Sequence, residues 1–160
     1  METSGLTQTL AAQAAAYRYD SLPDEAAIMA KQCLLDFLGV TLAGAREPLT
    51  GILHAEALAE GGNAQASLIG LPGKVTATQA ALINGSASHA LDYDDVQLFM
   101  MGHPSVPVAP VVFALAEQYG KSGADLITAF VAGFETECRI GASVSPSHYA
   151  AGWHATATLG

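Results

Sequence analysis

The sequence predicts an all-α fold, and three observations carry that prediction. The 160 residues are 51% hydrophobic and only 13% charged, which argues against a disordered chain. Apolar residues recur at helical spacing through most of the length, between breaks at proline and glycine. Alanine and glycine are abundant and aromatic residues are few, which favours close-packed helices with small residues where they cross. The length is sufficient for one domain with a substantial core.

Three helices and one extended segment are predicted in the first half of the chain. The first helix covers residues 5–19 and the second residues 23–45, with Ser21 as the capping residue of the second. The second helix is apolar nearly all round, so we expect it to be central and buried. A third helix follows over residues 48–60. Residues 66–75 are too short and too rich in turn residues for a helix, so a short strand or extended loop is expected.

Three further helices are predicted in the second half. They start at Thr76 or Thr78, at Pro104 and just after Ser122, and they end near residues 91, 119 and 144. Pro110 falls inside the second of these and is expected to kink it. Ser122 and Asp125 have the spacing of a capping residue and its third helical partner. The chain ends on residues that read as the start of another helix at His154.

Charge and composition exclude several classes of protein. The formal charge is −9, from 15 acidic and 6 basic residues, and there is no basic patch for nucleic acid. No apolar run reaches the ~18 to 20 residues needed to span a bilayer, and the first 20 residues lack the pattern of a secretory signal. Cys33 and Cys138 fall in apolar helical patterns and are expected as reduced, buried thiols. We therefore expect a cytoplasmic protein that binds neither nucleic acid nor membrane.

The densest group of chemically active side chains lies between residues 84 and 110. His89 and Asp92 are three residues apart at a helix end, so they can touch; the alternative is a structural histidine beside the negative end of the helix. Asp94 and Asp95 follow, and such a run normally forms a solvated loop or the cap of the next element, so both are interpreted as supporting residues. The sequence lacks the D-x-D-x-D-G and H-E-x-x-H patterns, so no metal site is expected.

Two histidines each precede a predicted helix. His103 lies between Gly102 and Pro104, where the field of a helix start favours a neutral imidazole and free N–H groups bind carboxylates. Such a histidine can accept a proton from a carbon acid; the alternative is a turn histidine in solvent. His154 is also at a helix start, with the hydroxyl of Thr156 available to cap or donate. With no nucleophile or phosphate-loop motif present, the pattern indicates general acid–base chemistry.

Four ordered motifs resemble one known family. They are N-G-S-A-S-H-A-L-D-Y-D-D from residue 84, G-H-P-S from residue 102, G-x-E-x-x-x-R-I-G from residue 133 and G-W-H-A-T-A-T-L-G from residue 152. Together with L-L-D-F-L-G-V-T-L-A-G from residue 34, they are similar to the N-terminal helical domain of the MmgE/PrpD family. That family includes 2-methylcitrate dehydratase, cis-aconitate decarboxylase and iminodisuccinate epimerase.

The resemblance implies a large all-α domain and a smaller α+β lid, with the active site between them. It implies homodimers that act on small di- or tricarboxylates without a metal or other cofactor. Asp92, His103 and His154 match active-site positions, and His89, Gly102 and Ser105 are expected around them as substrate-binding residues. Residues 1–160 would then be part of the helical domain, without the lid and the lysines that meet the substrate, so weak or no activity is expected of this chain alone.

The leading functional hypothesis is a hydro-lyase of the 2-methylcitrate dehydratase type. Within the same family, a decarboxylase or an epimerase is the alternative, although Val96 stands where the decarboxylases have threonine. A hypothesis from another class is a non-catalytic helical fragment that is stable as an oligomer.

Overall fold

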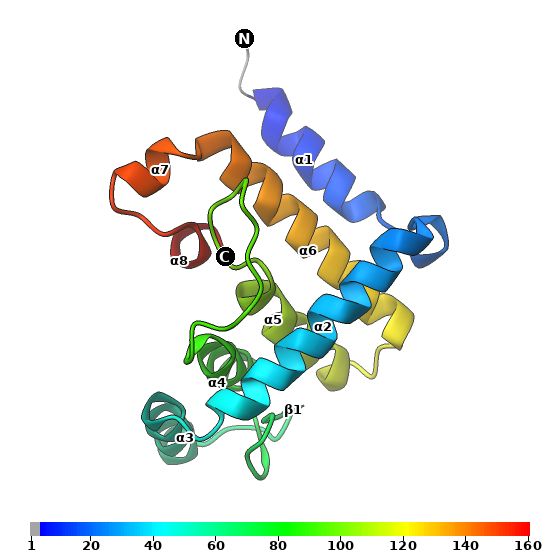
Figure 1. Ribbon diagram of the computed structural model, residues 1–160. Coiled ribbons are helices and arrows are strands. Elements are labelled where there is room, and N and C mark those ends of the chain that lie inside the picture. The colour runs from blue at the N-terminus through cyan, green and yellow to red at the C-terminus, as the bar shows by residue number, and fades with distance from the viewer. Residues whose placement is uncertain (1–3) are drawn as a thin grey trace.

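The computed structural model describes residues 4–160, and the fold is all-α, as predicted (Figure 1). Residues 1–3 of the predicted domain lie outside the described residues. Within residues 4–160 there are eight α-helices, a 3₁₀ turn and one antiparallel strand pair. Their order is α1 Ser4–Ala16, η1 Tyr19–Ser21, α2 Asp24–Gly44, α3 Pro48–Glu60, β1 Ala66–Ser67, β2 Lys74–Val75, α4 Ala77–His89, α5 Ser105–Gln118, α6 Gly123–Val144, α7 Ser147–Ala150 and α8 Ala155–Leu159.

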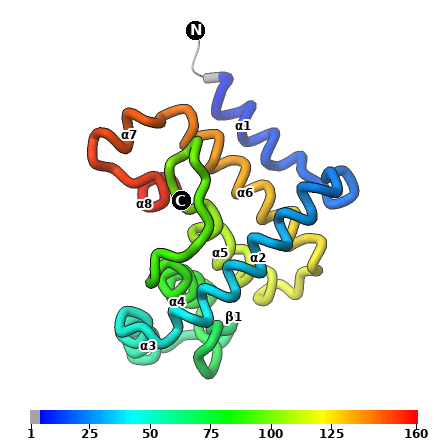
Figure 2. Tube along the Cα trace, in the orientation of Figure 1, coloured from blue at the N-terminus to red at the C-terminus, as the bar shows by residue number. Residues whose placement is uncertain are grey.

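The body of the molecule is made of α2, α4, α5 and α6, which pack against one another, with α1 lying along α6 (Figures 1 and 2). One core lies between α2, α5 and α6, where Phe37 stacks on Phe113 with ring centroids 5.8 Å apart. A second core lies under the strand pair, where Ile83 of α4 meets Leu68 and Val75. The predicted extended segment near residues 66–75 is therefore confirmed as a small hairpin that covers one end of α4.

The predicted cap at Ser122 and the predicted helix start at Thr76 are both confirmed. Ser122 accepts from the Asp125 N–H, and the Asp125 side chain accepts from the Ser122 N–H in return. Thr76 and Gln79 form the same reciprocal arrangement at the start of α4. Pro110 lies inside a continuous α5, where its ring packs close to Gly85 of α4. The caps fix where α4 and α6 begin, and Gly85 leaves room for the Pro110 ring where α4 and α5 pack together.

Two predictions about the helices are wrong. Ser21 does not cap α2, since it belongs to η1 and its hydroxyl donates to the Arg18 carbonyl. The first helix ends at residue 16, earlier than predicted. The predicted helix start at His154 is confirmed by α8, whereas α7 was not predicted, because four residues are too few for a periodic pattern.

Helix α2 is buried on one face only, which corrects the prediction of a helix enclosed on all sides. Phe37 and Leu34 are buried, whereas the side chains of Ile28, Leu35 and Leu42 are more than half exposed. The sequence of a helix does not show how many other helices cover it, so its apolar pattern could not predict that one face of α2 is exposed. By length and composition α2 is also long and apolar enough to cross a membrane, although Lys31 and Asp36 interrupt its apolar run; a core helix of a soluble protein passes the same test.

The loop between α4 and α5 passes beside α8 and carries the predicted site (Figure 2). It turns at two residues in the left-handed region, Asp92 with φ 50° and Met101 with φ 55°. Across the second of these turns, the N–H of Gln97 donates to the Gly102 carbonyl over 2.9 Å, which draws the loop into a narrow hairpin. A Cβ on Gly102 would lie 3.0 Å from the Thr156 hydroxyl oxygen, so glycine permits the close approach of α8.

Candidate active site

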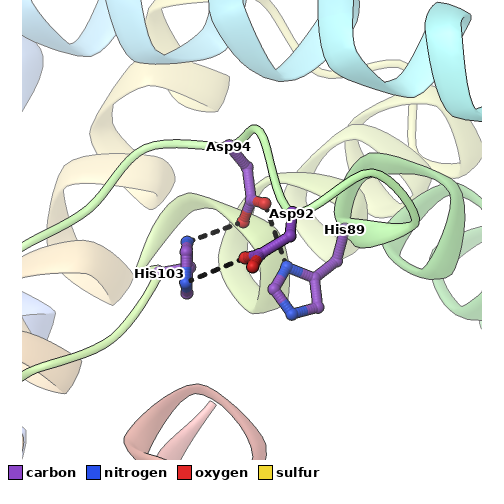
Figure 3. A group of neighbouring side chains, drawn as sticks. All are labelled: His89, Asp92, Asp94 and His103. Atoms are coloured by element: carbon purple, nitrogen blue, oxygen red, sulfur yellow. Dashed lines mark hydrogen bonds and ion pairs between the residues drawn. The ribbon is translucent and has the colours of Figure 1, made fainter.

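Four side chains from the end of α4 and the following loop converge at one point (Figure 3). His89 is the last residue of α4, and His103 lies two residues before α5. Asp94 lies between the two rings, with Oδ1 2.9 Å from His89 Nδ1 and Oδ2 3.2 Å from His103 Nδ1. On the other edge of the His103 ring, Nε2 lies 3.6 Å from Asp92 Oδ1. A single carboxylate therefore orients two imidazole rings.

The expected contact between His89 and Asp92 is made by their backbones, where the Asp92 N–H donates to the His89 carbonyl. Their side chains lie near each other, with one ligand atom of each within 4.8 Å, and the Asp92 side chain is 80% exposed. The chain leaves α4 through the left-handed turn at Asp92, so the carboxylate that reaches back to His89 is Asp94, which is 2% exposed. Asp94 was interpreted as a supporting residue, and the structure gives it the central place in that support.

His154 completes a row of three histidines from three segments. Its ring stacks on that of His103, with centroids 5.6 Å apart and planes 19° apart. His89 meets the other side of the row edge-on, 4.9 Å from His103. Tyr149 of α7 touches His154 in turn, at 5.9 Å. The sequence predicted His103 and His154 as site residues, and the fold brings them together although they lie far apart along the chain.

The start of α5 is occupied by groups of the chain itself. Asp95 accepts from the Ser105 N–H at 3.2 Å and from the Ser105 hydroxyl at 2.5 Å. The His103 N–H donates to the Thr156 hydroxyl at 2.7 Å, so this threonine accepts a hydrogen bond that ties the loop to α8 and does not cap its own helix. These amides were expected to receive a substrate carboxylate; instead, Asp95 fits the other interpretation of the aspartate run, a cap for the next element.

Two residues predicted to bind substrate are enclosed in this arrangement. Ser105 is buried and its hydroxyl is used by Asp95. Gly102 is also buried, and its N–H points to the Gln97 carbonyl at 3.4 Å. In the described residues both therefore hold the loop in place, and a substrate-binding role for them stays a prediction.

An unexpected acidic side chain lies below the loop. Glu137 of α6 is 5% exposed, and neither of its carboxylate oxygens has a hydrogen-bond partner among the described residues. Burial, with a contribution from the charge of Asp95, raises the pKa of Glu137 to about 8. The sequence analysis missed Glu137. Its position could have been noticed, because it lies three residues after Phe134 and four before Gly141, on the apolar face of the helix.

The two cysteines are free and half-buried, in agreement with the prediction of reduced thiols. Burial, and then the charge of Asp95, raises the pKa of the Cys33 thiol to about 11. Burial, and then the charge of Glu137, raises the pKa of the Cys138 thiol to about 12. Both therefore stay protonated near neutral pH, which disfavours a nucleophilic role.

Two cavities open beside the histidine row. A cavity of about 320 Å³ lies at the loop and is lined by both apolar side chains and imidazole rings. It is lined by Val96, Leu98, Met101, Gly102, His103, Tyr149 and His154. A larger one of about 720 Å³ includes His89 and His154. In the described part of the chain, the ion pairs of lysine and arginine lie elsewhere, at Lys74–Glu117 and Arg139–Glu135.

The fold and site thus define a helical domain that carries a histidine–aspartate centre suited to proton transfer. A sequence model described as the MmgE/PrpD N-terminal domain matches residues 8–160. The chain belongs to the MmgE/PrpD family, and the resemblance noted in its motifs is confirmed.

The chain is similar to proteins named cis-aconitate decarboxylase. It is 30% identical to the one from Homo sapiens over 145 residues, which cover 88% of this chain and 30% of that protein. It is also 30% identical to the one from Aspergillus terreus over 163 aligned positions, which cover 98% of this chain and 33% of that protein. A similar match is found to the cis-aconitate decarboxylase-like protein oryM from Aspergillus oryzae. The chain spans about a third of the length of these relatives.

Proposed function

We propose that this chain supplies the acid–base part of a lyase active site for a small di- or tricarboxylate, in a cytoplasmic enzyme that needs no metal cofactor. The observation that carries the proposal is the stack of His103 and His154, with Asp92 at 3.6 Å from one of the two rings. Two adjacent imidazoles can hold a proton donor and a proton acceptor on one side of a bound carbon acid. The names of the relatives support the lyase class.

Decarboxylation of cis-aconitate is the first reaction to test, because the relatives carry that name. In that reaction a carbon–carbon bond breaks and carbon dioxide leaves. The electron pair stays on the substrate, and a carbon of the substrate must then accept one proton. We assign its delivery to His103 or His154, and the carboxylates of Asp92 and Asp94, at 3.6 and 3.2 Å from the His103 ring nitrogens, support that assignment.

Dehydration of 2-methylcitrate is the second candidate, and Val96 favours it. The decarboxylases of the family resemblance have threonine at this position, whereas here an apolar side chain lines the cavity beside His103 and His154. In a dehydration, one group removes the proton next to a carboxylate and another protonates the departing hydroxyl, so water leaves. An apolar wall suits a substrate that carries a methyl group.

The site has acidic groups but no neighbouring cation in the described residues, and an anionic substrate needs one. We propose that the cations come from the part of the enzyme that corresponds to the remaining two-thirds of the relatives. This chain alone is then weakly active or inactive.

The test uses the complete gene product that contains these 160 residues. It is incubated with cis-aconitate, 2-methylcitrate and iminodisuccinate in turn, and the products are identified by NMR. Turnover of cis-aconitate to a five-carbon dicarboxylate supports the first candidate, and turnover of 2-methylcitrate to an unsaturated tricarboxylate supports the second. Absence of turnover with all three contradicts the proposed function and favours a non-catalytic helical module.

A further inference from the structure

Two buried atoms at the centre of the site face each other without a hydrogen bond. Asp94 Oδ2 and His103 Nδ1 lie 3.2 Å apart, and neither has a hydrogen-bond partner among the described residues. Asp94 as a whole is 7% exposed, so solvent does not reach this oxygen. A buried carboxylate oxygen and a buried ring nitrogen that make no hydrogen bond are costly, and a cation is a ligand that both atoms can bind.

We propose that His89, Asp94 and His103 form a binding site for a divalent transition-metal ion of the zinc type, with Asp92 as the fourth ligand. One ligand atom can be taken from each of these four residues so that all four atoms lie within 4.8 Å of one another. Three of the residues come from the loop, and the fourth ends α4, so the site is held at a junction of two elements (Figure 3).

The spacing of the donors fits a small ion. Zinc binds histidine nitrogen and carboxylate oxygen at about 2.0 to 2.2 Å, so its ligand atoms lie roughly 3.3 Å apart around a tetrahedron. The separation of Asp94 Oδ2 from His103 Nδ1 is already 3.2 Å. The widest separation, 4.8 Å, must shorten. Asp92 lies on an exposed turn and can move to close it.

The chemistry of the donors selects the class of ion. Two imidazole nitrogens with two carboxylates suit zinc, cobalt, nickel and copper. Calcium and magnesium prefer a shell of oxygens and take histidine poorly. The four ligands are spaced irregularly along the chain and only the folded loop assembles them, so no metal motif could be recognised in the sequence.

The consequence for activity follows from the shared residues and rests on the proposed function. A metal ion that occupies the ring nitrogen of His103 removes that nitrogen from proton transfer. Zinc is therefore an inhibitor of the enzyme rather than its cofactor. Relief of inhibition by a chelator is expected, because the apo site is the active form.

The binding experiment uses the purified 160-residue chain and isothermal titration with zinc chloride. We expect one zinc ion per chain. His89→Ala and Asp94→Asn are expected to weaken binding by more than the ~10- to 100-fold that loss of an outer-shell partner costs. His54→Ala, on α3, is the matched control and should bind like the unaltered chain. Cobalt should give the absorption spectrum of a four-coordinate ion, and magnesium should give no heat of binding.

Three results overturn the inference: no zinc binding, zinc binding that survives both His89→Ala and Asp94→Asn, or equal binding of magnesium. Circular dichroism of each variant identifies loss of the fold. If Asp94→Asn unfolds, zinc binding by His89→Ala and the cobalt spectrum of the unaltered chain still test the metal site, because the partly exposed His89 can be replaced without opening the core.

Inhibition is measured separately on the complete gene product. Zinc that binds the 160-residue chain while the complete product turns over none of the three carboxylates contradicts the proposed function and leaves the metal site standing. Turnover that zinc at saturating concentration does not reduce contradicts the inhibitory role.

Discussion

At the scale of single residues, the role of Asp94 could not be read from spacing along the chain. Helical geometry predicts contact between residues three or four apart, so His89 was paired with Asp92. The helix ends at His89, and the left-handed turn at Asp92 passes the contact to Asp94 instead. The residue types thus predicted that histidine and aspartate side chains lie together. The turn at Asp92 determines that Asp94, and not Asp92, is hydrogen-bonded to His89.

Glu137 makes stability depend on pH in a direction that can be tested. Its pKa is raised from 4.5 to about 8 by burial and by Asp95. Between these two values the folded chain keeps the proton that the unfolded chain releases, so the unfolded state binds fewer protons. Stability therefore falls as pH rises from about 4.5 to about 8, and Glu137→Gln removes this part of the loss.

The measurement is the urea midpoint at about pH 5 and about pH 8. The gain in stability from Glu137→Gln over the unaltered chain should be larger at the higher pH. Glu56→Gln, on the exposed face of α3, is the control and should follow the unaltered chain at both values. Identical pH dependence for Glu137→Gln and the unaltered chain would show that the carboxyl is not held neutral by the fold.

At the scale of elements, the crossing of α2 and α4 depends on Gly44. A Cβ at this position would lie 1.9 Å from the Ala87 carbonyl oxygen. Gly44→Ala must push the helices apart and should cost about 1 to 3 kcal/mol or more of the free energy of unfolding. Gly51, inside α3, has open space around it, so Gly51→Ala should instead stabilise by about 0.5 to 1 kcal/mol.

Chemical denaturation of the two alanine variants tests this prediction. Because both replace a helical glycine by alanine, the helix propensity gained is the same, and the difference between them reports the crossing alone. Equal stability of the two variants would mean that α2 does not approach α4 as closely as the fold requires.

Much of the element level was predictable, since caps and breaks are local. The reciprocal cap at Ser122 and the bounds of α3 follow from a few neighbouring residues. The failures are tertiary: Ser21 has a cap's side chain but lies in a 3₁₀ turn, and α2 has an apolar surface whose cover depends on the rest of the molecule.

At the scale of the whole molecule, several large apolar side chains face outward. Leu98 and Phe99 at the loop tip are more than three-quarters exposed, and Ile28, Met29, Leu35 and Leu42 of α2 are more than half exposed. Contiguous apolar surface of this kind favours association. We expect the 160-residue chain to self-associate, in line with the proposed homo-oligomer.

Light scattering over a range of protein concentrations tests this expectation. The mass should exceed that of one chain and rise with concentration. Leu98→Ser with Phe99→Ser should lower it, whereas Tyr119→Ser, exposed near the end of α5, is the control. A single-chain mass at every concentration would contradict the expectation.

The sequence predicted most of the residues that gather at the site, but it predicted few of the contacts between them. Three of the histidines lie together as their motifs suggested. The inward placement of Ser105 and the burial of Glu137 required the fold, because no pattern within either segment reports what packs against it. The chemistry that remains to be tested is proton transfer by the stacked pair.

The measurement that tests this most directly is kcat of His103→Gln in the complete gene product, on the carboxylate that it turns over. We expect a fall of ~100- to 10,000-fold, the usual contribution of a placed proton-transfer group. His54→Gln, remote from the site on α3, should keep the activity of the unaltered enzyme. A folded His103→Gln variant with unchanged kcat would contradict the assignment of proton transfer to this histidine.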